Sequence, residues 1–182
     1  MGLFCRMTFR CRSHAMYACV PISRAVVLLL VAVWFPGFVG QSAAQSIAVI
    51  GADGHATSIS AAQIASATHV TVIAEDHGAA ARFEGVPLAQ VLTMAGVPLG
   101  DSLHGTRLAE VLLVSATDNY KVAFALAEAD PAFAVREIIL ADKRDGKPLD
   151  AKEGPFRIVA PGDKRPARWI RQVTELRVMA VK

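Results

Sequence analysis

The chain has 182 residues and a formal net charge of +3, and 53% of its residues are hydrophobic. Four arginines and no acidic residue lie before residue 45, so the rest of the chain has a net charge of −1 (3 − 4). Binding to nucleic acids relies on a clustered surplus of lysine and arginine, and this balance therefore predicts no nucleic-acid partner.

Residues 1–44 have the pattern of a cleavable secretory signal peptide. Basic residues precede an apolar run at 25–39, and Ser42 and Ala44 are small residues at the two positions that a signal peptidase reads. The run is shorter than the roughly 20 residues that cross a bilayer, which argues against the alternative of a single-span anchor. We expect cleavage after Ala44, a periplasmic or secreted location, no membrane span after cleavage, and one domain at 45–182.

The distribution of cysteine limits the chemistry of this domain. All three cysteines, Cys5, Cys11 and Cys19, lie within the N-terminal segment. Residues 45–182 therefore contain no disulfide, no thiolate nucleophile and no thiolate metal ligand. With 138 residues (182 − 44), the domain is long enough to bury a hydrophobic core without disulfide bonds.

The first predicted elements of the domain are short. An apolar, β-prone segment at 46–50 predicts a strand, and Asp53–Gly54 predicts the turn that follows it. An alanine-rich segment at 60–67 is compatible with a short helix. A further strand is predicted at 70–73, and the polar residues 75–78 end it.

The clearest predicted helix follows Pro87, whose missing N–H costs nothing at a helix start. Apolar residues then recur with helical spacing, at Leu88, Val91, Leu92 and Ala95. Gly96 stands where a C-terminal cap favours a positive φ. These features predict a helix that ends at about residue 95.

The second half of the chain is predicted to be mostly β. A nearly continuous apolar run at 108–115 predicts a strand buried on both faces, and 117–119 has turn chemistry. A polar turn is predicted at 143–148. Further strands are predicted at 120–126, 135–141, 156–160 and 173–181, the last with Thr174, Leu176, Val178 and Ala180 on its more apolar face. The whole pattern predicts a single α+β domain with strand-rich mixed sheets and few short helices.

Several short motifs occur in an order that is typical of one family. They are Gly85-Val-Pro-Leu88, the Asp-Asn-Tyr turn that ends at Tyr120, Gly146-Lys-Pro-Leu149, Gly154-Pro-Phe-Arg-Ile-Val-Ala-Pro-Gly162, and the Arg168-Trp169 step. With these motifs the chain resembles the oxidoreductase molybdopterin-binding domain, the sulfite oxidase family. The resemblance covers roughly residues 82–178, about the C-terminal half of the family domain, and implies a sulfite-oxidase-like fold.

The resemblance also implies a cofactor for which the chain lacks a ligand. In catalytic members a cysteine thiolate binds molybdenum, and this chain has no cysteine after Cys19. Serine or alanine does not replace a soft thiolate ligand. Catalytic members are often exported already folded by a twin-arginine signal, whereas residues 1–44 contain no adjacent arginine pair. We therefore expect no cofactor, with molybdopterin bound without a cysteine ligand as the alternative.

Five side chains are the candidate ligand-binding residues. Arg157 interrupts an apolar strand, so it either pairs with a carboxylate while half-buried or points into a cleft. Arg168 offers a planar fork for an anion, and Trp169 either stacks on a ligand ring or fills the core. Asp118 and Tyr120 either form a polar rim or serve only the turn and the strand. We expect no catalytic residue among them.

The remaining polar residues are expected to be structural. The basic segment, which contains Lys164, Arg165, Arg168 and Arg171, is expected to be mostly a solvated loop balanced by Glu153, Asp163 and Glu175. The histidine spacings predict no metal site, and the chain has no nucleotide-binding glycine motif and no serine-hydrolase elbow.

The sequence thus predicts a non-catalytic binding module for a small anionic ligand or an envelope protein partner. A molybdopterin-dependent oxidoreductase and a purely structural subunit of a larger complex are the alternatives.

Overall fold

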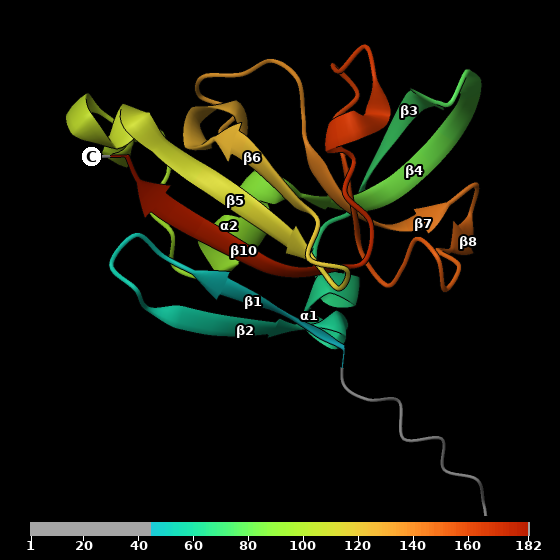
Figure 1. The fold of residues 1–182 in the computed structure, drawn as a ribbon, viewed down its shortest axis with the longest axis horizontal. Coiled ribbons are helices and arrows are strands. Elements are labelled where there is room, and N and C mark those ends of the chain that lie inside the picture. Colours follow the sequence, from blue (N-terminus) through green and yellow to red (C-terminus); the bar gives the residue numbers. More distant parts are fainter. Residues whose placement is uncertain (1–44, 182) are drawn as a thin grey trace, which may run out of the picture. The chain divides into compact units, whose positions relative to one another are not determined.

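The computed structural model describes residues 45–181, which form two five-stranded sheets around one hydrophobic core (Figure 1). The predicted signal peptide lies outside the described residues. In strand order, the first sheet consists of β2 (Ala56–Ser60), β1 (Ser46–Ile50), β10 (Val173–Ala180), β5 (Glu110–Ala116) and β6 (Lys121–Ala125). β1 pairs with β10 in parallel and the other neighbours are antiparallel, so the sheet is mixed, as predicted.

The second sheet is antiparallel and contains β7 at its centre. It is ordered β3 (Val70–Asp76), β4 (Ala79–Pro87), β7 (Ile139–Arg144) and β8 (Lys147–Pro148), and β9 (Arg157–Val159) also pairs with β7. The α-helices are α1 (Ala61–Ser66) and α2 (Leu88–Met94). Four short 3-10 helices complete the described part: η1 (Gly100–Ser102), η2 (Gly105–Ala109), η3 (Leu126–Glu128) and η4 (Pro166–Arg168).

α2 forms where the helical spacing predicts it, and the alanine-rich segment that was compatible with a short helix forms α1. Ser60 caps α1 through a capping box, in which its hydroxyl accepts from the N–H of Gln63 and its own N–H donates to the Gln63 side chain. In α2 the buried residues are Leu88, Val91 and Leu92, one turn apart on a single face. Full burial of such a side chain contributes about 1.5–3 kcal/mol to stability, so this face fixes the helix on the core.

The predicted cap of α2 and the predicted turn between β5 and β6 both contain a residue with positive φ. Gly96 ends α2 with φ of 82°, and its N–H donates to the Thr93 carbonyl. Asn119, in the predicted 117–119 turn, has φ of 66°.

No helix within residues 45–181 is long and apolar enough to span a membrane.

Two predicted strands are wrong in their limits or burial. β5 begins at Glu110, and its residues alternate between buried and half-buried, so one face packs on the core and the other is only partly covered. The prediction of burial on both faces was therefore wrong. Val135 is fully exposed in a loop, and the strand predicted from this residue begins only at Ile139.

The sequence also gave no indication of β4. Its buried positions include Ala81 and Gly85, which add little to an apolar pattern, and a β-bulge follows Glu84. A second bulge lies between Val173 and Glu175, and it changes which residues of β10 face the core. Leu176 and Val178 are buried as predicted, whereas Thr174 and Ala180 are exposed.

Candidate functional site

A polar pocket of about 350 Å³ opens where the β3–β4 turn, the β5–β6 turn, β9 and the segment around η4 meet. We call it the Arg157 pocket. Its polar and aromatic lining residues are Asp76, His77, Asp118, Tyr120, Glu153, Arg157, Trp169 and Arg171. Four of the five predicted ligand-binding residues therefore line one cavity: Asp118, Tyr120, Arg157 and Trp169.

Arg157 lies at the base of this pocket with only 3% of its side chain exposed. Its Nη1 donates to Asp76 Oδ2 at 3.1 Å and to Glu153 Oε1 at 2.9 Å, and its Nη2 donates to Asp76 Oδ1 at 3.2 Å. Its Nε is buried without a hydrogen-bond partner. The buried cation is thus held by two carboxylates, as a charge in a low-dielectric interior requires.

Arg144 joins the same network from β7. Its Nη1 donates to Asp76 Oδ2 at 3.0 Å and to Glu153 Oε1 at 3.1 Å. Burial alone raises the pKa of Asp76, but hydrogen bonding and the positive charges of Arg157, Arg144 and His77 outweigh it, and the pKa lies below its ordinary value. Two carboxylates and two guanidinium groups therefore balance one another.

Aromatic rings cover the other side of Arg157. Its guanidinium carbon lies 5.3 Å from the ring centroid of Phe83 and 5.7 Å from that of Trp169, within the range of cation–π contacts. Phe83 and Trp169 pack edge to face at 5.9 Å, and the Trp169 Nε1 donates to the carbonyl of Ala160. Trp169 is 4% exposed, so it mainly fills the core behind the pocket.

The rim of the pocket carries groups that are exposed. Tyr120 is 52% exposed, and its hydroxyl donates to the Ala167 carbonyl at 3.1 Å, which connects the β5–β6 turn to η4. The Asp118 carboxylate accepts from the N–H of Tyr120 and orders this turn. Arg171 is exposed and forms no ion pair with any described residue.

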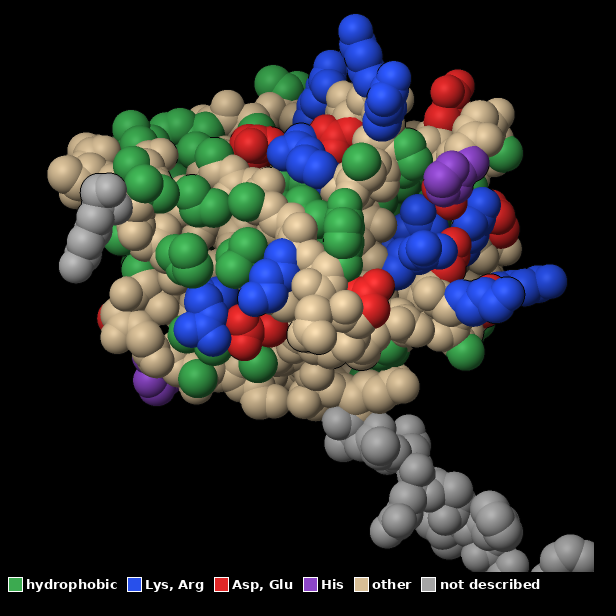
Figure 2. Space-filling view, in the orientation of Figure 1, with side chains coloured by type: hydrophobic (Ala, Val, Ile, Leu, Met, Phe, Trp, Pro, Cys, Tyr) green, Lys and Arg blue, Asp and Glu red, His purple; other side chains and the backbone are tan. Residues whose placement is uncertain are grey.

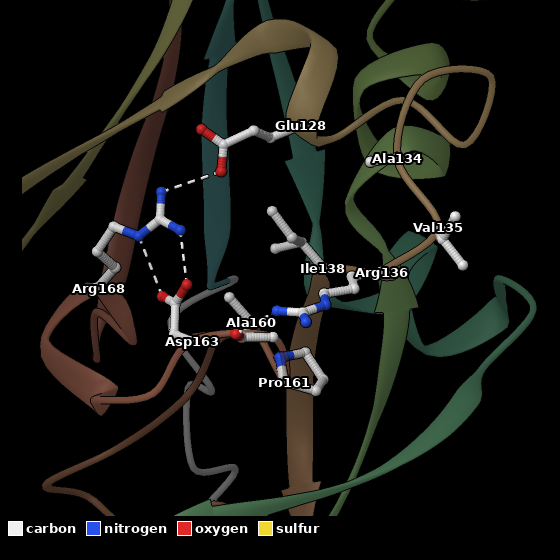
Figure 3. A pocket seen from close by; sticks show the side chains of 10 residues that line it. Glu128, Ala134, Val135, Arg136, Ile138, Ala160, Pro161, Asp163 and Arg168 are labelled. Atoms are coloured by element: carbon white, nitrogen blue, oxygen red, sulfur yellow. Dashed lines mark hydrogen bonds and ion pairs between the residues drawn. The ribbon is translucent and has the colours of Figure 1, made fainter.

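Arg168, the fifth predicted residue, lines a different cavity, shown in Figure 3. Its Nε and Nη2 donate to the two oxygens of Asp163 at 3.0 and 2.6 Å, and its Nη1 donates to Glu128 at 3.1 Å. Hydrogen bonding to Asp163 is the main cause of a raised pKa, and its guanidinium carbon lies 4.6 Å from the ring centroid of Phe124. The charge of Arg168 is therefore already balanced by Asp163 and Glu128, outside the Arg157 pocket.

Of the three acids predicted to balance the basic segment, one pairs with an arginine of that segment and two pair elsewhere. Glu153 pairs with Arg144 and Arg157, Asp163 with Arg168, and Glu175 with Arg177. Within residues 45–181, neither Lys164 nor Arg165 forms an ion pair, and both are exposed, like Arg171. The segment is solvated, as expected; its balance by Asp163 is confirmed through Arg168, whereas Glu153 and Glu175 pair with arginines outside the segment.

The histidines near the second sheet contact acids in pairs. His69 Nε2 lies 3.1 Å from Asp142 Oδ2, and His77 Nε2 lies 3.7 Å from Asp76 Oδ1. In the part of the chain that the structure describes, no group of three or more His, Cys, Asp or Glu side chains is placed to hold a metal ion.

Residues 54–182 match the family model described as the oxidoreductase molybdopterin binding domain. The chain belongs to this family. The match confirms the resemblance seen in the motifs and extends it from residue 82 back to residue 54. The sequence matches no curated protein.

A solved structure supports the molybdopterin-domain fold. The sulfane dehydrogenase SoxCD from Paracoccus pantotrophus superimposes with a TM-score of 0.59 at 16% sequence identity. The alignment covers 75% of this chain and 38% of the SoxCD chain, so this chain spans well under half the length of that protein. At this identity the likeness establishes the fold, and the predicted α+β fold class is confirmed.

The family is associated with a molybdopterin cofactor, and the described residues do not fit a thiolate-bound molybdenum centre. Residues 45–181 contain no cysteine, and hard oxygen or imidazole donors do not replace a soft thiolate. Arg157, the deepest cation of the pocket, already donates both terminal nitrogens to carboxylates, while its buried Nε has no hydrogen-bond partner.

Sequence reasoning missed the acidic half of the pocket. An arginine within an apolar strand predicts a carboxylate partner, and this signal was present at Arg157. The partner Asp76 lies 81 residues away and was interpreted as part of a strand-ending turn. Only the tertiary fold brings β3 and β9 to the same cavity.

Proposed function

We propose that this chain is an exported, non-catalytic member of the oxidoreductase molybdopterin-binding family that binds a small anionic ligand at the Arg157 pocket. The supporting observation is the way in which charges are distributed. The buried Asp76 and Arg157 and the half-buried Glu153 and Arg144 pair with one another, while Arg171 at the rim has no carboxylate partner among the described residues.

The rim supplies the groups that an anionic ligand needs. The guanidinium of Arg171 offers a planar set of donors for a carboxylate, sulfonate or phosphate. The half-exposed ring of Tyr120 stands beside it as an apolar contact surface. The Asp118 carboxylate on the same rim disfavours a ligand with negative charge over its whole surface, so we expect a single anionic group directed at Arg171.

The absence of a molybdenum centre is tested first by elemental analysis. The protein is purified from a host that makes the molybdopterin cofactor, and its metal content and pterin fluorescence after oxidation are measured. We expect folded, colourless protein without molybdenum. Stoichiometric molybdenum with a pterin signal would overturn the proposal in favour of the oxidoreductase.

Ligand binding is tested by titrating inorganic phosphate and sulfate while recording amide and indole NMR shifts. We expect saturable shifts at Tyr120, Trp169 and Arg171, and their loss in Arg171→Gln. The control Arg177→Gln removes the same charge from β10, at a residue that does not line this pocket, and is expected to retain the shifts. Shifts that Arg171→Gln leaves unchanged would contradict an anion site at this rim.

The proposed export rests on the sequence pattern of residues 1–44. A fusion of this segment to alkaline phosphatase, which requires an oxidising compartment, is expected to be active and processed after Ala44. An inactive fusion retained in the cytoplasm would contradict export.

A further inference from the structure

A second cavity, of about 340 Å³, lies on the far side of the segment that carries η4. We call it the Arg136 pocket. Figure 3 shows the side chains of Val135, Ile138, Ala160 and Pro161 at this cavity, with the guanidinium of Arg136 beside them. Its volume is at the lower end of the 300–1,000 Å³ that is typical of small-molecule sites, roughly enough for a short alkyl chain or one ring.

The acidic side chains of this pocket are already neutralised. Glu128 and Asp163 both accept hydrogen bonds from Arg168, which lies between them in Figure 3. Neither carboxylate is therefore free to bind a ligand cation without giving up Arg168.

The guanidinium of Arg136, in contrast, is not neutralised by any carboxylate of the described residues. Its Nη1 donates to the carbonyl of Gly162, which holds the side chain against the 161–165 segment. A Cβ at residue 162 would lie 2.2 Å from the Cδ of Arg136, so this position of the arginine requires glycine. Arg136 forms no ion pair within the described residues, and its other N–H groups remain available at the pocket.

The neighbouring segment adds to this positive charge. Lys164 and Arg165, next to the lining residue Asp163, are exposed and have no carboxylate partner in the described part of the chain. Figure 2 shows Lys and Arg side chains gathered over the segment around η4. The charged residues that line the pocket cancel, and the adjacent Lys164, Arg165 and Glu137 leave a local charge of +1 (4 − 3).

We propose that the Arg136 pocket binds an organic monocarboxylate with a short apolar body. The apolar body lies against Ile138, Ala160 and Pro161, where it is partly removed from water. The carboxylate accepts hydrogen bonds from Arg136, and Lys164 and Arg165 raise the local concentration of anions. This site is separate from the Arg157 pocket, and the inference does not depend on the function proposed there.

Three six-carbon probes separate the contributions of charge and apolar burial. Hexanoate, 1-hexanol and hexylammonium are titrated into the purified protein at constant ionic strength, with binding measured by calorimetry and located by NMR. We expect hexanoate to bind with shifts at Ala134, Val135, Ile138 and Gly162, hexanol to bind at least about tenfold more weakly, and hexylammonium not to bind.

Two variants test the assigned residues. Arg136→Gln is expected to weaken hexanoate binding about tenfold and leave hexanol binding unchanged, because it removes only the charge-assisted contact. Ala134→Leu, a substitution in the loop that lines the pocket, is expected to abolish binding of both probes by filling the cavity. Circular dichroism establishes that each variant is folded.

Two controls keep the result specific. Lys147→Gln removes one positive charge from the β7–β8 hairpin, and Arg171→Gln alters the Arg157 pocket; both are expected to retain the hexanoate shifts at Ala134, Val135, Ile138 and Gly162. The proposal is overturned if hexanoate does not bind, if hexanol or hexylammonium binds as tightly, or if Arg136→Gln has no effect.

Discussion

Two arginines in this domain have the same pairing and very different surroundings. Arg157 and Arg168 are each bound by two carboxylates, and each lies over an aromatic ring. The Arg157 side chain is 3% exposed, whereas that of Arg168 is 37% exposed. The comparison shows that the pattern of partners does not determine what an ion pair contributes; the loss of solvent around it does.

The largest expected effect is the removal of the buried cation. Arg157→Gln leaves the buried Asp76 with the more exposed Arg144 and His77, and breaking a buried pair from one side costs about 3–5 kcal/mol. We expect a loss of free energy of unfolding of about 3 kcal/mol or more, measured by urea denaturation followed by circular dichroism.

A matched double variant tests whether the loss of stability comes from the unpaired carboxylate of Asp76. The double variant Asp76→Asn with Arg157→Gln removes both charges of the pair and is expected to recover part of the lost stability. A single variant within about 1 kcal/mol of the unmodified protein would contradict the buried network, because only exposed pairs contribute so little.

A smaller effect is expected in acid. The folded-state pKa of Asp76 is lowered, so its contribution to stability is fully present above the unfolded pKa of about 3.9 and is lost as the pH falls through the folded value. The difference in free energy of unfolding between the unmodified protein and Arg157→Gln is therefore expected to narrow below about pH 4. Urea titrations between about pH 2 and 6 measure this difference. A difference that stays constant across this range would show that Asp76 titrates without influence from Arg157.

The extent to which the sequence predicted this fold follows from the kind of contact involved. α2 and Gly96 were predictable because helical spacing and a positive-φ cap are local signals. β4 was missed because alanine and glycine occupy two of its buried positions and a bulge interrupts its register. The family motifs indicated the fold as a whole, but they did not indicate this strand.

Local sequence signals also predicted only part of the candidate site. Asp118, Tyr120, Arg157 and Trp169 were selected from motifs and share one pocket, since the β5–β6 turn, β9 and the η4 segment meet there. Arg168 follows the same motif, yet η4 directs its side chain to the opposite side of the segment from Trp169. Arg168 ends η4 and Trp169 directly follows it, and no sequence spacing indicates which of these two neighbours lines which cavity.

The smallest effect is expected at Arg168, the more exposed of the two arginines. Arg168→Gln removes a pair that water already screens, and we expect a loss of at most about 1 kcal/mol in free energy of unfolding. The residual effect is expected to shrink further at 1 M NaCl, where the Debye length falls to about 3 Å, whereas the effect of Arg157→Gln is expected to persist. Urea denaturation of both variants at low and high salt measures the contrast. Equal losses, or equal salt sensitivity, would mean that burial does not distinguish the two arginines.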